Sequence, residues 1–118
     1  MEFMHVGVPT QLKRPGEVYM EGMKLFIVDP STNPYNVEWL RFEPGSPMPM
    51  ELQTLNHVAY KVDDLAAAVK GKKVLVPPTQ VAPELTIAFI LEDKLPIEFM
   101  QVGCQPASGC GGGCCCGG

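Results

Sequence analysis

The chain has 118 residues, of which 46% are hydrophobic and 19% charged, so it is long enough for one domain with a core and too apolar for a disordered protein. Its net charge of −4 and its sequence pI of about 5.0 do not supply the basic surface that nucleic-acid binding needs, which argues against a nucleic-acid partner. No apolar run approaches the ~20 residues of a membrane span, and the opening M-E-F-M-H-V does not resemble a secretory signal. We therefore expect a cytoplasmic protein that is not embedded in a membrane.

The first half of the chain predicts short strands separated by turns. Apolar and β-branched runs place these strands at residues 3–8, 17–20, 23–28 and 36–42. Residues 9–16 and 29–34 carry the Pro, Gly, Asp and Asn typical of turns. Residues 44–54 contain several prolines and are interpreted as a linker.

The second half predicts a strand, a helix and three further strands. The helix begins after Asp63 or Asp64, either of which can serve as its N-cap, and Gly71 can end it in a left-handed conformation. The strands are expected at 55–62, at 73–76, where Pro77-Pro78 stops the third, and at 85–91 and 96–102. This order predicts an α+β fold with a mainly antiparallel sheet.

Two short sequence motifs occur once in each half. H-V-G-V at 5–8 resembles H-V-A-Y at 57–60, and V-E-W-L at 37–40 resembles I-E-F-M at 97–100. The chain has only two histidines, and both fall in the first motif. Each half therefore begins with a histidine strand and ends with a strand that carries a glutamate between apolar neighbours.

The repeated histidines and glutamates are candidate metal ligands. Glu38 and Glu98 each share a strand face with apolar residues, where a carboxylate is costly to bury unless it is paired or bound to a metal. Two imidazoles and two carboxylates suit a divalent ion such as Zn²⁺, Ni²⁺, Mn²⁺, Fe²⁺ or Co²⁺. The predicted ligands are therefore His5, Glu38, His57 and Glu98. The alternative is that these residues only form hydrogen bonds in the fold.

Longer stretches around these motifs resemble a known superfamily. H-V-A-Y-K-V-D-D-L-A-A-A-V, followed by A-F-I-L-E-D-x-x-P-I-E-F-M-Q, is similar to the C-terminal module of glyoxalase-like proteins. M-H-V-G-V-P-T resembles their opening strand. Residues 3–102 thus resemble the vicinal oxygen chelate superfamily, which includes glyoxalase I, bleomycin resistance proteins, dihydroxybiphenyl dioxygenase-like enzymes, methylmalonyl-CoA epimerase and fosfomycin-resistance proteins.

The resemblance implies a fold of paired βαβββ modules that form a curved, barrel-like mixed sheet. Residues 1–103 would be one glyoxalase-like domain, with module 1 at about 3–43, a linker at 44–54 and module 2 at about 55–102. The first module would be abbreviated, because its sequence shows no clear helix. A metal would lie inside the sheet.

The resemblance also implies a function. A divalent metal held by the four predicted ligands would bind a small oxygenated substrate, and Glu38 or Glu98 would be the catalytic base of a lyase or isomerase reaction that moves a proton. The alternative is a non-catalytic protein that binds a small molecule, metal or metalloid for resistance or sequestration. Lys61, Arg41 and Trp39 are the tentative substrate-pocket residues, and a homodimer is possible because swapped dimers are common in the family.

Residues 104–118 form a Cys- and Gly-rich tail, which we expect to be flexible. All five cysteines lie there, so they do not form a disulfide framework for the domain. Four of them form C-x-x-x-C-C-C, namely Cys110, Cys114, Cys115 and Cys116. Thiols suit soft metal ions or redox chemistry. The tail would capture metal or metalloid, deliver metal to a site or partner, or be dispensable.

Overall fold

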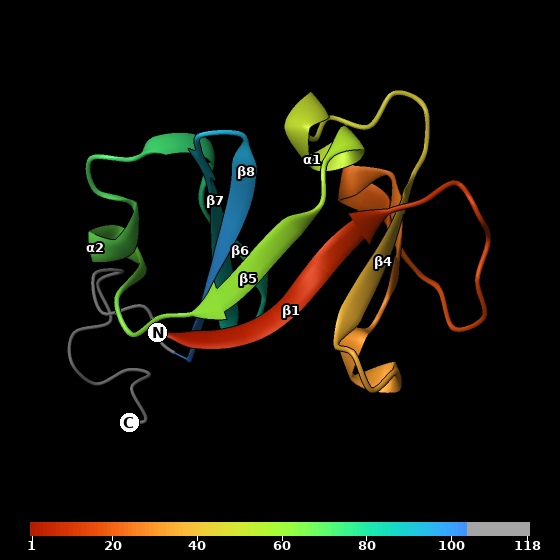
Figure 1. Cartoon of the computed structure of the whole chain (residues 1–118), viewed down its shortest axis with the longest axis horizontal. Coiled ribbons are helices and arrows are strands. Elements are labelled where there is room, and N and C mark those ends of the chain that lie inside the picture. The colour runs from red at the N-terminus through yellow and green to blue at the C-terminus, as the bar shows by residue number, and fades with distance from the viewer. Residues whose placement is uncertain (104–118) are drawn as a thin grey trace.

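The fold is built on one mixed sheet of eight strands, which curls into a half-barrel (Figure 1). In this computed structural model the described residues are 1–103. The strands are β1 Glu2–Pro9, β2 Val18–Met20, β3 Leu25–Val28, β4 Val37–Phe42, β5 His57–Lys61, β6 Lys73–Ala82, β7 Leu85–Glu92 and β8 Leu95–Val102. Their order across the sheet is β2-β3-β4-β1-β5-β8-β7-β6. The expectation of a curved mixed sheet is confirmed.

The two halves of the chain meet at the centre of this sheet. β1 pairs with β5 in antiparallel fashion, and each of these strands pairs in parallel with the last strand of its own half, β4 or β8. The remaining neighbours, β2–β3, β3–β4, β6–β7 and β7–β8, are antiparallel. The strands that carry the repeated His and Glu residues are therefore the four central strands.

Two short α-helices lie against the sheet, and only one of them was expected. α2 spans Leu65–Val69, where the Asp64 carboxylate accepts a hydrogen bond from the backbone N–H of Ala67, and Gly71 follows with a φ of 74°. Short 3₁₀ turns, η1 at Glu21–Met23 and η2 at Pro30–Thr32, complete the described helical structure. No helix within residues 1–103 has the length and apolarity that crossing a membrane requires.

The predicted linker 44–54 is not entirely a linker, because α1 spans Met50–Thr54. Its N-cap residue, Pro49, offers no capping side chain, so the local sequence gives little sign of a helix. Burial explains it instead: Leu52 is only 2% exposed and packs with Ile87 and Phe89 of β7. A tertiary contact thus stabilises a helix that local propensity does not specify.

The prediction that Pro77-Pro78 stops a strand at Val76 is also wrong, because β6 continues to Ala82. β6 is the outermost strand of the sheet, where a residue without an N–H group is tolerated. Its register against β7 shifts between Val76 and Thr79, which accommodates the two prolines as an irregularity.

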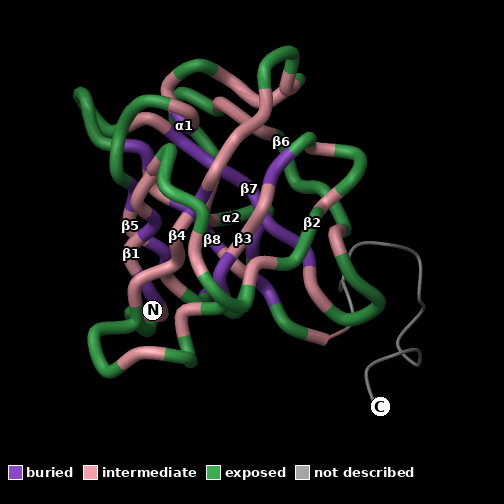
Figure 2. Tube along the Cα trace, turned by 90° about the vertical axis from the view of Figure 1, so that its right-hand side faces the viewer, coloured by how far each residue is buried: buried purple, intermediate pink, exposed green. Residues whose placement is uncertain are grey.

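Apolar side chains are buried on both faces of β7, which is visible as a long buried stretch in Figure 2. Ala88 and Ile90 join Leu65 of α2 in one core cluster on the outer face. Ile87 and Phe89 point the other way and join Leu52 of α1 in a second cluster. The sheet is therefore covered by α2 outside and partly closed by α1 at its concave face (Figure 1).

Replacing Leu52 with alanine should destabilise the protein by about 2–5 kcal/mol, because the side chain is buried and its loss leaves a void. Met50 lies on the same helix and is 63% exposed, so Met50→Ala should change the free energy of unfolding by less than about 0.5 kcal/mol. Urea unfolding of both variants measures the difference. Equal stabilities would show that α1 does not contribute to the core.

Candidate metal centre

The strand register brings the repeated residues together in two rows across the centre of the sheet. In the first row, Gly7 of β1 lies between Glu38 of β4 and His57 of β5. In the second row, Ala59 of β5 pairs with His5 of β1 on one side and with Glu98 of β8 on the other. Each row contributes one imidazole and one carboxylate, with a residue that has little or no side chain between them.

Gly7 leaves room for the imidazole of His57. A Cβ atom built on Gly7 would overlap the Cε1, Nδ1 and Nε2 atoms of the His57 ring. The ring therefore lies close to the backbone of β1, and it also makes an edge-on contact with Phe89, whose centroid is 5.1 Å away. The need for glycine here comes from close packing, since Gly7 does not have a positive φ.

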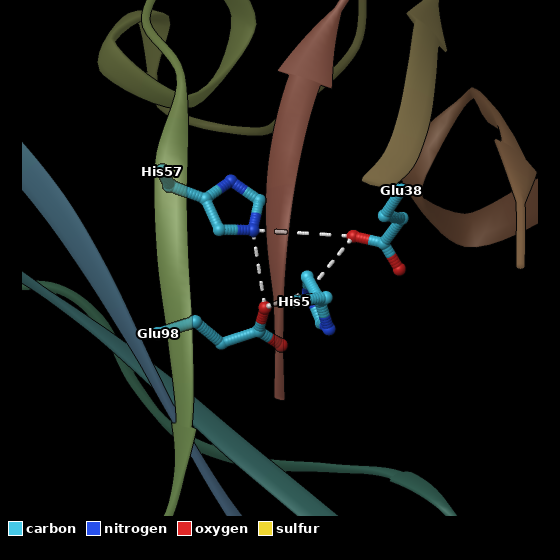
Figure 3. Close-up of side chains that lie close together, drawn as sticks. All are labelled: His5, Glu38, His57 and Glu98. Atoms are coloured by element: carbon cyan, nitrogen blue, oxygen red, sulfur yellow. Dashed lines mark hydrogen bonds and ion pairs between the residues drawn. The ribbon is translucent and has the colours of Figure 1, made fainter. Parts of the chain in front are cut away.

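The four side chains point toward one another (Figure 3). His5 Nε2 lies 3.2 Å from Glu98 Oε1 and 3.3 Å from Glu38 Oε1. His57 Nε2 lies 3.2 Å from Glu98 Oε1 and 3.9 Å from Glu38 Oε1. One donor atom from each of the four residues lies within 4.8 Å of the others, so the sequence repeat identified a single buried group that could hold a metal ion. We call these four residues the donor group.

Charge holds the donor group together. Burial of the His5 imidazole lowers its pKa, but the carboxylates of Glu38 and Glu98 outweigh this and raise the pKa to about 10. Burial raises the pKa of the Glu98 carboxyl, yet His5 and His57 together lower it below its ordinary value. At neutral pH the His5 ring is therefore a positively charged imidazolium, and Glu98 is an ionised carboxylate between the two histidine rings.

The fit of a metal ion can be tested on the hydrogen bonds of the donor group. Among residues 1–103, the buried His5 Nε2 is held by ion-pair contacts with two carboxylate oxygens within 3.3 Å but makes no hydrogen bond of regular geometry. Ligands at about 2.0–2.2 Å from one ion are separated by at most ~4.4 Å, so small inward movements of the side chains would complete a site. Two nitrogens and two carboxylate oxygens match a borderline divalent ion. The residues present fit a metal.

A cavity of about 170 Å³ opens from the donor group over the concave face of the sheet. Apart from the donor group itself, its described lining consists only of Met, Leu, Ile, Val and Phe side chains. They come from β2–β4, from β6–β8, and from the region around α1 that includes Met48 and Leu52. We call this space the apolar cavity.

A second, wider hollow reaches the donor group from another side. It measures about 460 Å³ and shares His5, Glu38 and Met100 with the apolar cavity. Its remaining lining mixes polar and apolar residues: Glu2, Asp29, Ser31 and Asn36 lie there together with Phe3, Met4 and Pro30. We call it the polar opening. His5 and Glu38 are thus accessible from both hollows, whereas His57 and Glu98 line only the apolar cavity.

The three tentative substrate-pocket residues, Lys61, Arg41 and Trp39, do not line the apolar cavity, and their role in a substrate pocket stays a prediction. Trp39 and Arg41 alternate with Glu38 along β4 and point to the other face, where Trp39 packs under the guanidinium of Arg14, 3.7 Å from the ring centroid. Arg41 forms a two-pronged ion pair with Glu17, with both N···O distances at 2.8 Å. Lys61 is exposed at the end of β5.

Sequence reasoning missed Gly7 as a determinant of the site, and it missed the apolar lining. The signal for Gly7 was present, since each histidine is followed two residues later by a small residue, Gly7 or Ala59. Met48 and Leu52 gave no signal because they lie in the segment interpreted as a linker. The cysteines of the predicted tail, Cys110, Cys114, Cys115 and Cys116, lie outside the described residues.

Comparisons with known proteins add no relatives to this picture. No protein-family model matches the chain, and no curated protein is significantly similar to it. The case for a metal centre therefore rests on the donor group and its surroundings.

Gly7→Ala should destabilise the protein by about 1–3 kcal/mol and weaken metal binding, because the added methyl group displaces the His57 ring. Gly22→Ala is the matched control, since a Cβ at Gly22 meets no atom within 4 Å. Thermal unfolding and Zn²⁺ titration of both variants check this. Wild-type stability and affinity in Gly7→Ala would contradict the packing described here.

Metal binding should release the proton of His5. Because the pKa of His5 is about 10 in the metal-free protein, an incoming ion displaces about one proton from this ring at pH 7, and affinity should rise up to tenfold per pH unit below pH 10. Calorimetric titrations of Zn²⁺ in buffers of different ionisation enthalpy count the protons released. A proton count of zero would contradict the charge state assigned to His5.

The stability of the metal-free protein should also depend on pH. The folded pKa of His5 is raised above 6.5, so its stabilising contribution is complete below that pH and is lost as the pH rises through about 10. The pKa of Glu98 is lowered below 4.5, so its contribution is present above pH 4.5 and is lost in acid. Melting temperatures measured with a chelator present should therefore fall both above neutral pH and below pH 4.5.

Proposed function

We propose that the protein is a metal-dependent enzyme of the vicinal oxygen chelate type, which transfers a proton on a small oxygenated substrate as a lyase or isomerase does. The observation that carries the proposal is the donor group, in which equivalent strands of the two halves bring His5, Glu38, His57 and Glu98 within 4.8 Å of one another. The cavity beside it offers a place for a ligand.

The arrangement of strands supports this resemblance. β1 to β4 and β5 to β8 occupy mirrored positions in the order β2-β3-β4-β1-β5-β8-β7-β6, as expected of two related modules joined through their first strands. α2 lies between β5 and β6, while the described segment between β1 and β2 has no helix. The missing helix supports the proposal that the first module is an abbreviated one.

A divalent ion held by the donor group would act as a Lewis acid toward two neighbouring oxygens of the substrate. The protein supplies the ligand atoms and the surroundings of the ion. His5 and His57 offer ring nitrogens, and their orientation is fixed by burial and by packing against Gly7 and Phe89. With a ligand bound, the apolar lining would help to exclude water from the ligand side of the site.

Glu38 is better placed than Glu98 to act as the base. Glu98 Oε1 lies 3.2 Å from both imidazoles, its side chain is 9% exposed, and its pKa is lowered, so it is a firmly held anion. Glu38 is 17% exposed and lies 3.3 and 3.9 Å from the two imidazoles. Since it lines both hollows, Glu38 can take a proton from a ligand in the apolar cavity and pass it to the polar opening.

Glu98→Gln should lower the affinity for a divalent ion by more than the ~10–100-fold that loss of an outer-shell partner typically costs, because the amide removes both a ligand and a charge. Glu84→Gln is the control, since Glu84 is exposed and lies outside the donor group. Metal content by mass spectrometry after purification without added metal, together with Zn²⁺ titration, compares the two variants.

The tail thiols must be separated from the domain in this experiment. A full-length variant in which all five cysteines are replaced by serine removes soft ligands from residues 104–118 and leaves the donor group intact. About one ion per chain in this variant, lost again with Glu98→Gln, would support the proposal. Metal bound only when the cysteines are present would contradict it and favour the alternative of a thiol-based metal or metalloid binder.

A further inference from the structure

We propose that the ligand of this site is a compact molecule with its two neighbouring oxygens at one end, an apolar body about the size of one six-membered ring, and no second anionic group. This inference rests on the proposed function, because the oxygens are assigned to the metal that the donor group would hold. It goes further by naming the chemical class of the ligand from the two hollows beside that group.

The size of the ligand body follows from the apolar cavity. Its volume is about 170 Å³. A cavity of roughly 150 Å³ lined by aliphatic and aromatic side chains accommodates benzene in another protein, so this one has room for one ring or a short branched chain. It is smaller than the ~300–1,000 Å³ of most ligand pockets, which excludes a peptide- or nucleotide-sized body from it.

The polarity of the body follows from the lining. Beyond the donor group, the described wall of the cavity has only apolar side chains, and its floor carries two carboxylates. Within residues 1–103, no Lys, Arg, Ser, Thr, Asn or Gln side chain lines it. A second charged group buried here would lose its hydration without a compensating partner, which costs several kcal/mol.

The polar opening does not provide an alternative place for a second anion. Its described lining includes the carboxyl groups of Glu2, Asp29 and Glu38, and His5 is its one residue of a basic type. The carboxylates of the polar opening would repel a phosphate or carboxylate extension of the ligand. In the apolar cavity, no polar side chain beyond the donor group would solvate such an extension. Anionic extensions are therefore disfavoured on both sides of the donor group.

The wall can adapt to the shape of the ligand body. Four of its residues are methionines: Met20, Met23, Met48 and Met100. Methionine has an unbranched, flexible side chain that fills irregular gaps and makes favourable contacts with aromatic rings. These four methyl groups also report ligand binding, while Met1 and Met50, which are 86% and 63% exposed, serve as internal references.

The test uses hydroxamates, each of which presents two neighbouring oxygens to a metal. The protein is the full chain with its five cysteines replaced by serine, loaded with Zn²⁺. Acetohydroxamate has no ring, benzohydroxamate has one, and 4-carboxybenzohydroxamate adds a second anion. Calorimetry measures the affinities, and the methyl NMR signals of the methionines locate the ligand.

Benzohydroxamate should bind about 10–100-fold more tightly than acetohydroxamate, since burying a phenyl ring gives an advantage of that order. It should shift the signals of the four cavity methionines and leave those of Met1 and Met50 unchanged. 4-Carboxybenzohydroxamate should bind at least about tenfold more weakly than benzohydroxamate. Equal affinities for all three probes, or shifts absent from the cavity methionines, would overturn the inference and leave the metal site standing.

A substitution that favours the 4-carboxy probe over benzohydroxamate gives a second test. Met23 lies in the wall of the cavity within the 3₁₀ turn η1 and is only partly buried, so Met23→Lys adds a cation without disturbing the core. It should raise the affinity for the 4-carboxy probe about tenfold relative to benzohydroxamate, whereas Met50→Lys should not. No change with Met23→Lys would contradict the assignment of the ligand body to this cavity.

A metal-free arm separates this inference from the proposed function. Toluene, which has no oxygen, should shift the cavity methionines of the chelator-treated protein, because the cavity does not depend on the ion. If toluene does so while no hydroxamate binds the Zn²⁺-treated protein, the apolar cavity is retained as a binding site and the metal-dependent function fails. If toluene shifts none of these signals, the ligand class proposed here fails.

Discussion

The register between β1 and β5 is the constraint on which the rest of the site depends. Val6 pairs with Val58, so Gly7 faces His57 and His5 faces Ala59. A shift of one residue would turn one strand over relative to the other, so that the two imidazoles would point to opposite faces of the sheet, because side chains alternate along a strand. The absence of a side chain at Gly7 then lets the His57 ring lie close to the backbone. This pairing, together with the parallel pairings of β1 with β4 and of β5 with β8, gives both rows of the donor group.

The electrostatics of the donor group follow from the same geometry. Two carboxylates and two imidazoles are held in one buried group, so the arrangement is stable only with a positive charge among them. In the metal-free protein the proton on His5 supplies that charge, which is why its pKa is raised to about 10 in spite of burial. A divalent ion would supply it more effectively, and the two compete for the same nitrogen. A metal ion bound by the donor group would therefore have to replace this proton.

Most strands and all four members of the donor group could be predicted from the sequence, and the reasons are local. Alternation of apolar residues indicates strands such as β4 and β8, and a glutamate in an apolar row, as at Glu38 and Glu98, is conspicuous without any knowledge of the fold. The internal repeat then linked each glutamate to a histidine. Asp64 was similarly identified as a candidate cap from its position before an apolar helix.

The features that could not be predicted depend on contacts between distant parts of the chain. α1 forms because Leu52 packs on Ile87 and Phe89, residues far away in sequence. β6 passes through Pro77-Pro78 because it is an edge strand, and position in a sheet is not a local property. For a related reason the sequence did not show which residues line the apolar cavity: Arg41 lies on the opposite face of β4 from Glu38 and is paired with Glu17.

The two hollows place the donor group between two different environments, the apolar cavity and the polar opening. The apolar cavity, where the proposed ligand body would lie, is partly closed by α1. Among residues 1–103, the polar opening on the other side shares His5, Glu38 and Met100 with it. A ligand seated in the apolar cavity would therefore exchange protons with solvent through the polar opening, and Glu38 is the one carboxylate that borders both. Two similar rows of residues thus come to occupy different environments. The repeat supplies the four members of the donor group, and under the proposed function the unequal surroundings of Glu38 and Glu98 would give them different tasks.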